Sequence, residues 1–306
     1  MLKGIKKYGN QVTIINLEDL STSQFEELRQ EDIIDKEVLA YAQDENETSF
    51  VEETEGRLTV VYQLLDKQKL SMKAGDIPQI EPMTFLVTDQ DLFILHNNKT
   101  APLLEDVVDK VDLDKEPKHI LFQLLTLFTK EYFTFMEGIN AERDYLIKDL
   151  RRRPNRKNLK GLANLQSGSV YILMGAMQNS HMLDDIKDLP NYNSFSHESK
   201  EQLRDTMIEA KQLSNMCSLH SRILEQLASS YNNVLSNNLN ENVTTLTIIS
   251  IGISLLATVT SFYGMNVKLP FAKIDIVWFL ILLITSIVAL ISIIIMKIFV
   301  ARHHNS

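Results

Sequence analysis

The chain has 306 residues and a formal net charge of −9, from 31 Lys and Arg against 40 Asp and Glu, and it contains one cysteine. The tail from residue 241 onward carries four basic and two acidic residues, so residues 1–240 alone carry −11. This acidity does not suit nucleic acid, which needs clustered positive charge, but it suits a region that attracts cations, and a lone cysteine excludes both a disulfide framework and a zinc-finger spacing.

Residues 1–112 predict a small α/β domain. Residues 23–42 indicate one or two short helices, and the short β-rich runs are separated by Glu-Gly and Asp-Gln-Asp turns, a pattern typical of hairpins. The strands are expected at residues 12–15, 58–65, 84–87 and 92–95. No pattern in this domain points to catalysis.

Residues 113–240 predict a stalk of three long helices. The first two cover residues 119–150 and 157–189, with proline-containing breaks after each, and Ser196 is expected to cap the third. The third has no proline before residue 270, which predicts one helix of roughly 65 residues, about 100 Å long, that continues into the first apolar stretch. Its heptad-spaced seam consists of Ala210, Leu213, Cys217, His220, Leu224, Leu227, Tyr231 and Val234.

Residues 241–306 predict a membrane domain. Two uncharged stretches, 243–262 and 276–296, are each long enough to cross a bilayer, whose hydrocarbon core needs roughly 20 helical residues. Only the loop 263–275 separates them, so they must form a tight helical hairpin. The N-terminus has no apolar run typical of a signal peptide, and we therefore expect both termini on the cytoplasmic side and the loop on the outside.

The first span carries a polar stripe. On a helical wheel its polar side chains fall within an arc of about 80°, and most of the large aliphatic side chains point elsewhere. The stripe consists of Asn240, Thr247, Ser250, Ser254, Thr258 and Ser261. It is costly against hydrocarbon, so it should face water or another helix. Alternatively, Ser and Thr hydroxyls in membrane helices often bond their own i−4 carbonyls or allow close packing.

A water-filled path would require several copies of the chain. Two helices cannot enclose a pore, so each copy must contribute one helix to a symmetric ring. The seam on the third stalk helix gives those copies a way to pack. It could instead pack only on the chain's own two preceding helices, and both arrangements can hold on different helix faces.

The tetrapeptide Tyr263-Gly264-Met265-Asn266 follows directly after the first span, and a second span with basic residues behind it lies close to the C-terminus. In this position the sequence resembles the CorA family of magnesium channels. The α/β domain followed by three long helices extends the resemblance over the whole chain in outline. It implies an α+β fold that assembles as a homopentameric funnel, with inner helices lining the pore and outer helices facing lipid.

The resemblance also implies roles for single residues. Asn266, together with carbonyls of the Gly-Met-Asn turn, would receive hydrated Mg²⁺ at the pore mouth. Asn240 corresponds to a polar ring at the cytosolic end, and Leu246 to the hydrophobic gate. Asp205 corresponds to a carboxylate that binds a regulatory Mg²⁺ between subunits. The remaining pore-facing positions are Val243, Thr247, Ser250 and Ser254, and the stripe continues with Thr258 and Ser261.

The chemistry of this assignment is reasonable on its own. Mg²⁺ gives up its waters reluctantly, and neutral amides and carbonyls can hydrogen-bond a water shell without binding the ion too tightly for release. Asp89 and Asp91 are expected to serve a turn first and to share in a sensor site only secondarily. Phosphate-binding loops and catalytic signatures are missing from the sequence, so we expect neither an enzyme nor a nucleotide-driven pump.

The sequence therefore predicts a channel in the plasma membrane that passes Mg²⁺ down its electrochemical gradient, is gated by cytosolic Mg²⁺ and has no organic cofactor. Co²⁺ and Ni²⁺ are further candidate cations. One alternative is a Zn²⁺ transporter of the same superfamily. A second, from another class, is a membrane-anchored sensor or scaffold that conducts nothing. The expected partners are four further copies and membrane lipid.

Overall fold

A computed structural model of the chain describes residues 4–21, 23–24, 26, 28, 34, 36–66, 79–152, 156–265 and 276–304. The chain divides into two compact units, Met1–Tyr231 and Asn232–Ser306. One long helix, α6 (His197–Tyr263), contains the boundary between them. The division into 1–112, 113–240 and 241–306 stays a prediction.

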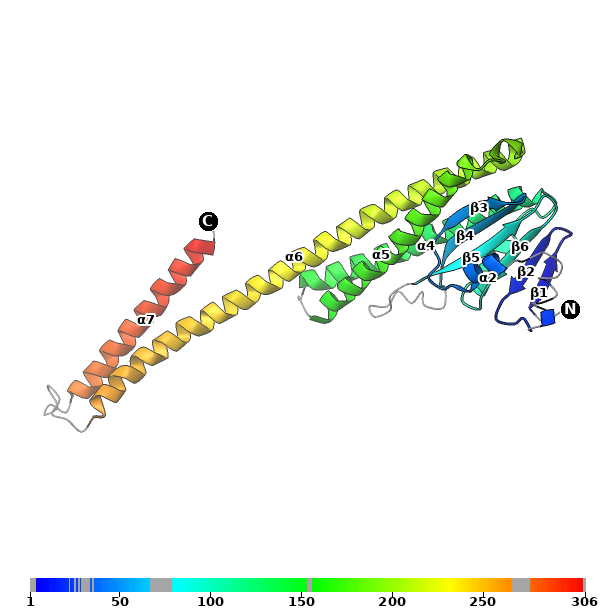
Figure 1. Ribbon diagram of the computed structural model, residues 1–306. Helices are drawn as coiled ribbons and strands as arrows, with labels where there is room; N and C mark the ends of the chain where they lie inside the picture. Colours follow the sequence, from blue (N-terminus) through cyan, green and yellow to red (C-terminus); the bar gives the residue numbers. More distant parts are fainter. Residues whose placement is uncertain are drawn as a thin grey trace. The chain divides into compact units, whose positions relative to one another are not determined.

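The first unit contains the predicted α/β domain (Figure 1). Its described residues form a six-stranded sheet in the order β1-β2-β6-β5-β4-β3, in which β2 and β6 run parallel and the other neighbours antiparallel. The strands are β1 (Ile5–Tyr8), β2 (Val12–Asn16), β3 (Phe50–Thr54), β4 (Arg57–Leu65), β5 (Ile80–Val87) and β6 (Leu92–His96). The four predicted strands are confirmed, and β1 and β3 are additional edge strands.

Strand β5 begins four residues before its predicted start and includes a proline. Pro82 lies opposite Gln63 of β4, but the pairing of β5 with β6 starts only at Thr84. A proline has no N–H to donate, so it is tolerated where one side of a strand lacks a partner. Pro82 is therefore tolerated because this part of β5 has no β6 neighbour, although the strand has neighbours on both sides from Thr84 onward.

Helices cover both faces of the sheet (Figure 1). Helix α2 (Lys36–Gln43) packs on one face, where Val38 joins a buried cluster with Ile15, Leu86 and Leu95. The other face is covered by α3 (Ala101–Val108), α4 (Pro117–Arg152) and α5 (Arg156–Asp185), and the first part of α6 joins the same buried cluster. Two short 3₁₀ turns, Ile186–Asp188 and Tyr192–Ser194, connect α5 to α6.

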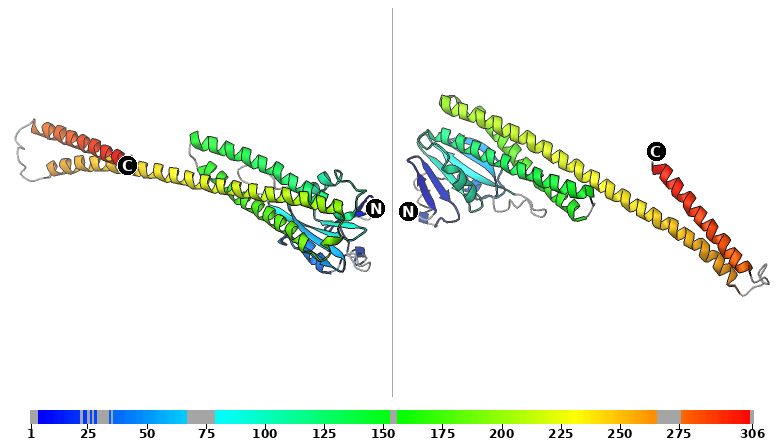
Figure 2. Two further views of the ribbon diagram at one scale, coloured as in Figure 1. Left: turned by 90° about the horizontal axis from the view of Figure 1, so that it is seen from above. Right: turned by 180° about the vertical axis from the view of Figure 1, so that it is seen from behind.

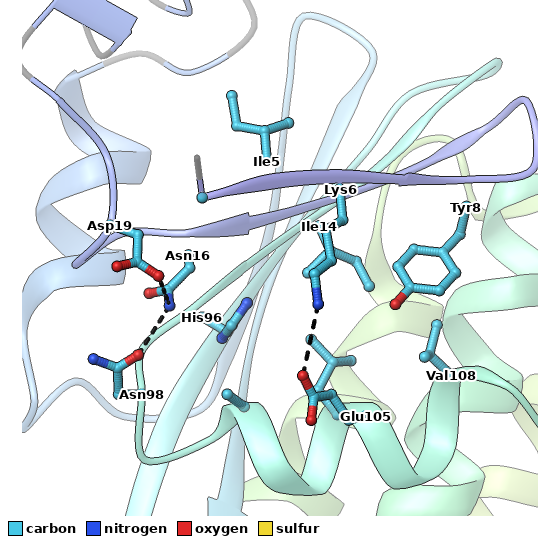
Figure 3. Close-up of a pocket in the computed structure, with 13 residues that line it drawn as sticks. Ile5, Lys6, Tyr8, Ile14, Asn16, Asp19, His96, Asn98, Glu105 and Val108 are labelled. Carbon is cyan, nitrogen blue, oxygen red and sulfur yellow. Dashed lines mark hydrogen bonds and ion pairs between the residues drawn. The ribbon is translucent and has the colours of Figure 1, made fainter. Parts of the chain in front are cut away.

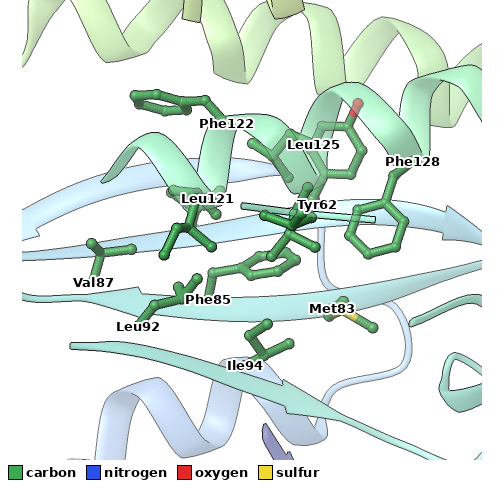
Figure 4. Close-up of a cluster of buried hydrophobic side chains, with 14 of the residues drawn as sticks. Tyr62, Met83, Phe85, Val87, Leu92, Ile94, Leu121, Phe122, Leu125 and Phe128 are labelled. Carbon is green, nitrogen blue, oxygen red and sulfur yellow. The ribbon is translucent and has the colours of Figure 1, made fainter. Parts of the chain in front are cut away.

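The main core lies between the sheet and α4 (Figure 4). Phe85 of β5 and Phe128 of α4 meet with ring centroids 6.3 Å apart, and both are fully buried. The buried Tyr62 hydroxyl is 2.8 Å from the Thr129 hydroxyl, so its polar end has a partner. This packing fixes the start of α4 on the sheet.

Helices α4 and α6 run parallel within the first unit, and α5, which lies between them in the sequence, runs in the opposite direction (Figure 2). Residues of α4 that contact α6 meet residues in the same order along α6. Thr126 and Thr206 hydroxyls lie 2.7 Å apart, and the Tyr231 hydroxyl donates to the Ile147 carbonyl at 3.4 Å. The predicted cap of α6 is confirmed, because the Ser196 hydroxyl accepts a hydrogen bond from the Ser199 amide at 3.1 Å.

The second unit is a helical hairpin. It consists of the C-terminal part of α6 and of α7 (Val277–His304), which runs antiparallel to it (Figures 1 and 2). Of the described helices, only α6 passes the test of length and apolar composition for a membrane span, while α7 contributes a shorter apolar stretch, Phe279–Ile295. The predicted span 276–296 agrees in position with α7.

Candidate functional site

The two helices of the hairpin meet along an apolar face of α6. Ile248 of α6 and Ala289 of α7 are each only 4% exposed. One turn further along α6, Gly252 lies so close to α7 that a Cβ added there would stand 2.7 Å from Cδ1 of Ile293. A glycine at this position is therefore what permits the close approach, as is common between membrane helices.

The predicted polar stripe lies on the opposite face of α6. At 100° per residue, the stripe is centred roughly 150° from Gly252 around the helix. All six stripe residues are exposed in the second unit, and so are Val243 at 59% and Leu246 at 65%. The stripe is therefore not buried by the α6–α7 contact, and close packing within the hairpin does not account for it.

Three stripe hydroxyls bond the helix's own backbone. Thr247 donates to the Val243 carbonyl at 2.8 Å, Ser250 to the Leu246 carbonyl at 2.8 Å, and Thr258 to the Ser254 carbonyl at 2.7 Å. These i−4 bonds are the alternative that the sequence left open. They occupy the hydroxyl hydrogens but leave the side chains exposed, so they do not exclude contact with water.

Helix α6 ends at the signature tetrapeptide. The Gly264 amide donates to the carbonyls of Thr260 and Ser261 at 3.0 and 3.1 Å, and the Met265 amide to that of Phe262 at 3.4 Å. Tyr263 is the last helical residue, and Met265 is 53% exposed. Asn266 lies outside the described residues, so its predicted role stays a prediction.

A pocket of about 260 Å³ adjoins this end of the hairpin. It is lined by Leu256, Val259, Thr260, Gly264, Ile281, Leu282 and Thr285. The lining is mainly apolar, and its two threonines bond helix backbone. The pocket offers no set of ligands for a bare cation.

The predicted regulatory carboxylates lie on different elements. Asp205 is exposed on α6, whereas Asp89 and Asp91 belong to the turn between β5 and β6. Asp89 forms a 2.9 Å ion pair with Lys118, and the backbone of Asp91 closes the turn with Thr88. In the described part of the chain, no group of three or more His, Cys, Asp or Glu residues is placed to hold a metal ion.

The seam on α6 packs inside its own chain. Leu213, Cys217 and Leu224 are each 1% exposed and belong to a buried cluster with residues of α4 and α5. His220 lies 3.5 Å from the Asn140 amide nitrogen and 3.4 Å from the Arg143 guanidinium. The intramolecular alternative is thus confirmed for these positions, while Val234 at the end of the seam is 40% exposed.

These features together define an α/β domain with three long helices and an apolar hairpin whose first helix presents hydroxyl groups. Residues 9–297 match the sequence model of the family described as "CorA-like Mg2+ transporter protein". The chain therefore belongs to the CorA-like Mg²⁺ transporter family, and the resemblance seen in the tetrapeptide is confirmed.

One curated relative is the "Cobalt/magnesium transport protein CorA" of Thermotoga maritima, 21% identical over 188 residues. That alignment covers 59% of this chain, and the chain spans only 53% of that relative.

Solved structures show the same fold. The complete CorA magnesium transporter of Methanocaldococcus jannaschii matches with a TM-score of 0.75 at 18% identity, covering 95% of this chain and 92% of that one. The ZntB cytoplasmic domain of Vibrio parahaemolyticus matches with a TM-score of 0.55 at 10% identity, covering 75% and 88%. The full-length CmaX protein also reaches 0.55, at 13% identity, covering 92% and 88%. The predicted fold class, an α/β domain with long helices and a C-terminal helical hairpin, is confirmed.

Proposed function

We propose that the chain is a subunit of a homopentameric channel that conducts hydrated Mg²⁺ across the plasma membrane. The observation that carries this proposal, beside the family, is the orientation of α6. Its hydroxyl stripe lies opposite the Gly252 face that binds α7. A single hairpin in a membrane would leave the stripe in lipid, which is costly, and a ring of copies gives it a shared aqueous axis.

Conduction in this proposal uses neutral oxygen and amide groups on both sides of an apolar constriction. Mg²⁺ enters with its waters at a ring of Asn266 amides, passes the stripe, and leaves past the Asn240 ring. None of these groups is charged, so the ion is held weakly enough to move on. Leu246 and Val243, both exposed on α6, form the apolar constriction that closes by excluding water.

Gating would follow from the acidity of the cytosolic part. Residues 1–240 carry −11, and Asp205 is exposed on α6, where it can face a neighbouring copy. Bound cytosolic Mg²⁺ screens such carboxylates and favours a closed symmetric ring. Loss of the ion lets them repel, which shifts the population toward the open state. Asp89 contributes less, because Lys118 already neutralises it.

The direct test is flux into proteoliposomes with Mg²⁺, Co²⁺, Ni²⁺ and Zn²⁺ in turn. We expect Mg²⁺ uptake that depends on membrane potential and is not blocked by equimolar Zn²⁺. Preferential Zn²⁺ flux would establish the zinc-transporter alternative instead. Absence of flux for every cation from a correctly inserted oligomer would refute conduction and leave the sensor or scaffold. Protease protection of the N-terminal domain in the same vesicles tests the cytoplasmic orientation of the termini.

A matched pair of variants tests the role of the stripe. Thr247 in α6 and Thr285 in α7 both donate to an i−4 carbonyl, at 2.8 and 2.6 Å, so Thr→Val removes the same bond at either site. If the stripe lines the pore, Thr247→Val should lower Mg²⁺ flux about two- to tenfold, which corresponds to the free energy of one hydrogen bond. Thr285→Val should not. Equal effects would contradict the assignment, as would normal flux in Asn266→Ala.

A further inference from the structure

A polar hollow lies in the first unit. It has a volume of about 540 Å³ and is bordered by the loop between α2 and β3, the ends of β4 and β5, the loop before α3, and α5. Its lining consists of Glu45, Asn46, Glu47, Thr48, Gln63, Gln79, Ile80, Glu81, Lys99, Tyr171, Met174 and Gln178. We call it the Glu81 pocket.

The Glu81 pocket carries an excess of negative charge. Its described lining contains three carboxylates, from Glu45, Glu47 and Glu81, against one ammonium group, that of Lys99. The Lys99 Nζ atom lies 3.0 Å from a carboxylate oxygen of Glu45 and 3.0 Å from one of Glu81. One cation is thus shared by two acids, and the described part of the lining has a net charge of two negative units.

The second oxygen of Glu81 gives an independent sign of a missing partner. The Glu81 side chain is only 6% exposed, and its Oε2 atom is buried with no hydrogen-bond partner among the described residues. A buried carboxylate oxygen without a donor is costly. Glu81 therefore keeps unused acceptor capacity in the pocket wall, and the charge of the described lining favours a ligand that is positively charged.

Another pocket of this unit differs in this respect (Figure 3). It measures about 470 Å³ and lies between the β1–β2 hairpin and α3. Its polar side chains already pair with one another: the Asn16 amide donates to Asp19 and Asn98, both at 2.9 Å, and Lys6 faces Glu105 at 3.7 Å. It therefore gives no comparable reason to expect a charged ligand.

The lining of the Glu81 pocket favours an organic cation over a metal ion. Mg²⁺ bound directly by protein needs near-octahedral oxygen ligands, and no suitable cluster of acidic residues is found in the described part of the chain. An alkylammonium group, in contrast, is what this pocket already accepts, since Lys99 is one.

The apolar part of the lining suits the methylene chain of such a cation. Tyr171 and Met174 of α5 border the pocket and remain 47% and 45% exposed. An aromatic face binds methylenes and attracts ammonium groups. We propose that the Glu81 pocket binds an aliphatic polyamine, with ammonium groups on Glu47 and Glu81 and methylenes over Tyr171 and Met174.

The test is calorimetric titration of the full-length protein in detergent with spermidine. One saturable site per chain is expected. Glu81→Gln should weaken binding about tenfold, because a hydrogen bond to a charged group is lost. Tyr171→Ala should weaken it about two- to fivefold. Tyr171 is half exposed, so this second variant stays informative if Glu81→Gln does not fold. Glu105→Gln, an acid of the other pocket, is the matched control and should bind like the wild type.

A magnesium arm separates the proposal from general attraction to an acidic surface. MgCl₂ at matched ionic strength should weaken spermidine binding no more than NaCl does. Displacement by Mg²⁺ alone would show that the pocket is a divalent-cation site and overturn the polyamine assignment. Equal weakening by Glu105→Gln and Glu81→Gln, or no saturable binding at all, would also overturn it. The result does not depend on whether the chain conducts Mg²⁺.

Discussion

The close approach of α6 and α7 at Gly252 makes a prediction that can be worked out from geometry. A Cβ at this position would lie 2.7 Å from Cδ1 and 3.3 Å from Cγ1 of Ile293. Carbon atoms pack favourably at about 3.5–4.0 Å, so an added methyl group is roughly 1 Å too close. Either Ile293 changes rotamer or the helices separate.

The net effect of Gly252→Ala is a balance of two terms. Overpacking costs about 1–3 kcal/mol, and the lower end applies because the clashing atom is the end of a flexible side chain. Ala is also favoured over Gly in a helix by about 1 kcal/mol. We therefore expect a change close to zero for Gly252→Ala and a loss of about 2 kcal/mol for Gly252→Val, which gains little in propensity and adds more volume.

A double-mutant cycle isolates the contact. Ile293→Val removes the clashing Cδ1, so it should be less harmful, or even favourable, when combined with Gly252→Ala, with a coupling of about 1 kcal/mol. Unfolding in sodium dodecyl sulfate can be followed by fluorescence of the chain's only tryptophan, Trp278 in α7. Ile287→Val, at a 49% exposed position of the same helix, is the matched control. A coupling indistinguishable from that control would refute the close approach.

Further predictions concern the first unit. Asn179→Ala should lower the free energy of unfolding by about 2–3 kcal/mol in a denaturant titration. The reason is that the Asn179 side chain accepts a hydrogen bond from the backbone N–H of Gln63 at 2.8 Å and donates one to the backbone carbonyl of Gln63 at 2.9 Å. Normal stability would contradict this. Burial raises the pKa of the Cys217 thiol to about 12, so a maleimide should label it only after unfolding, and rapid labelling of native protein would be the contrary result. Burial, and secondarily the charge of Arg143, lowers the pKa of His220, so the unfolded state binds the proton more tightly. Stability should be full above about pH 6.5 and fall as pH decreases toward the lowered value. His220→Gln should flatten this dependence, and an unchanged dependence in that variant would contradict the reasoning.

Much of the hairpin could be predicted because a membrane limits the choices. An uncharged stretch of about 20 residues has few alternatives to a helix, and the wheel then fixes which residues share a face. The stripe indeed lies on one exposed face of α6. Gly252 was visible in the sequence as the only glycine of the long helix before Gly264, but its contact with Ile293 depends on the rotation of α7, which sequence spacing does not specify.

The α/β domain was harder to predict at positions where tertiary contacts determine the secondary structure. The edge strand β3 (Phe50–Thr54) contains two glutamates, which are depleted in strands, so its sequence alone is weakly β-like. It forms because it pairs with β4. Strand β5 extends through Pro82 only because β6 is absent there. The seam on α6 is another case, since heptad spacing is the same whether the partner is another copy or the chain's own α4 and α5.

The intrahelical bonds of the stripe also bear on which ion the proposed pore would suit. Thr247, Ser250 and Thr258 each give their hydroxyl hydrogen to an i−4 carbonyl, so their oxygens present only lone pairs to the surroundings. Waters around a cation point their hydrogens outward and need acceptors, whereas waters around an anion point their oxygens outward and need donors. In the proposed ring, the bonds that first suggested a purely structural role would therefore make the wall a set of acceptors. Such a wall can solvate a hydrated cation without removing its water shell.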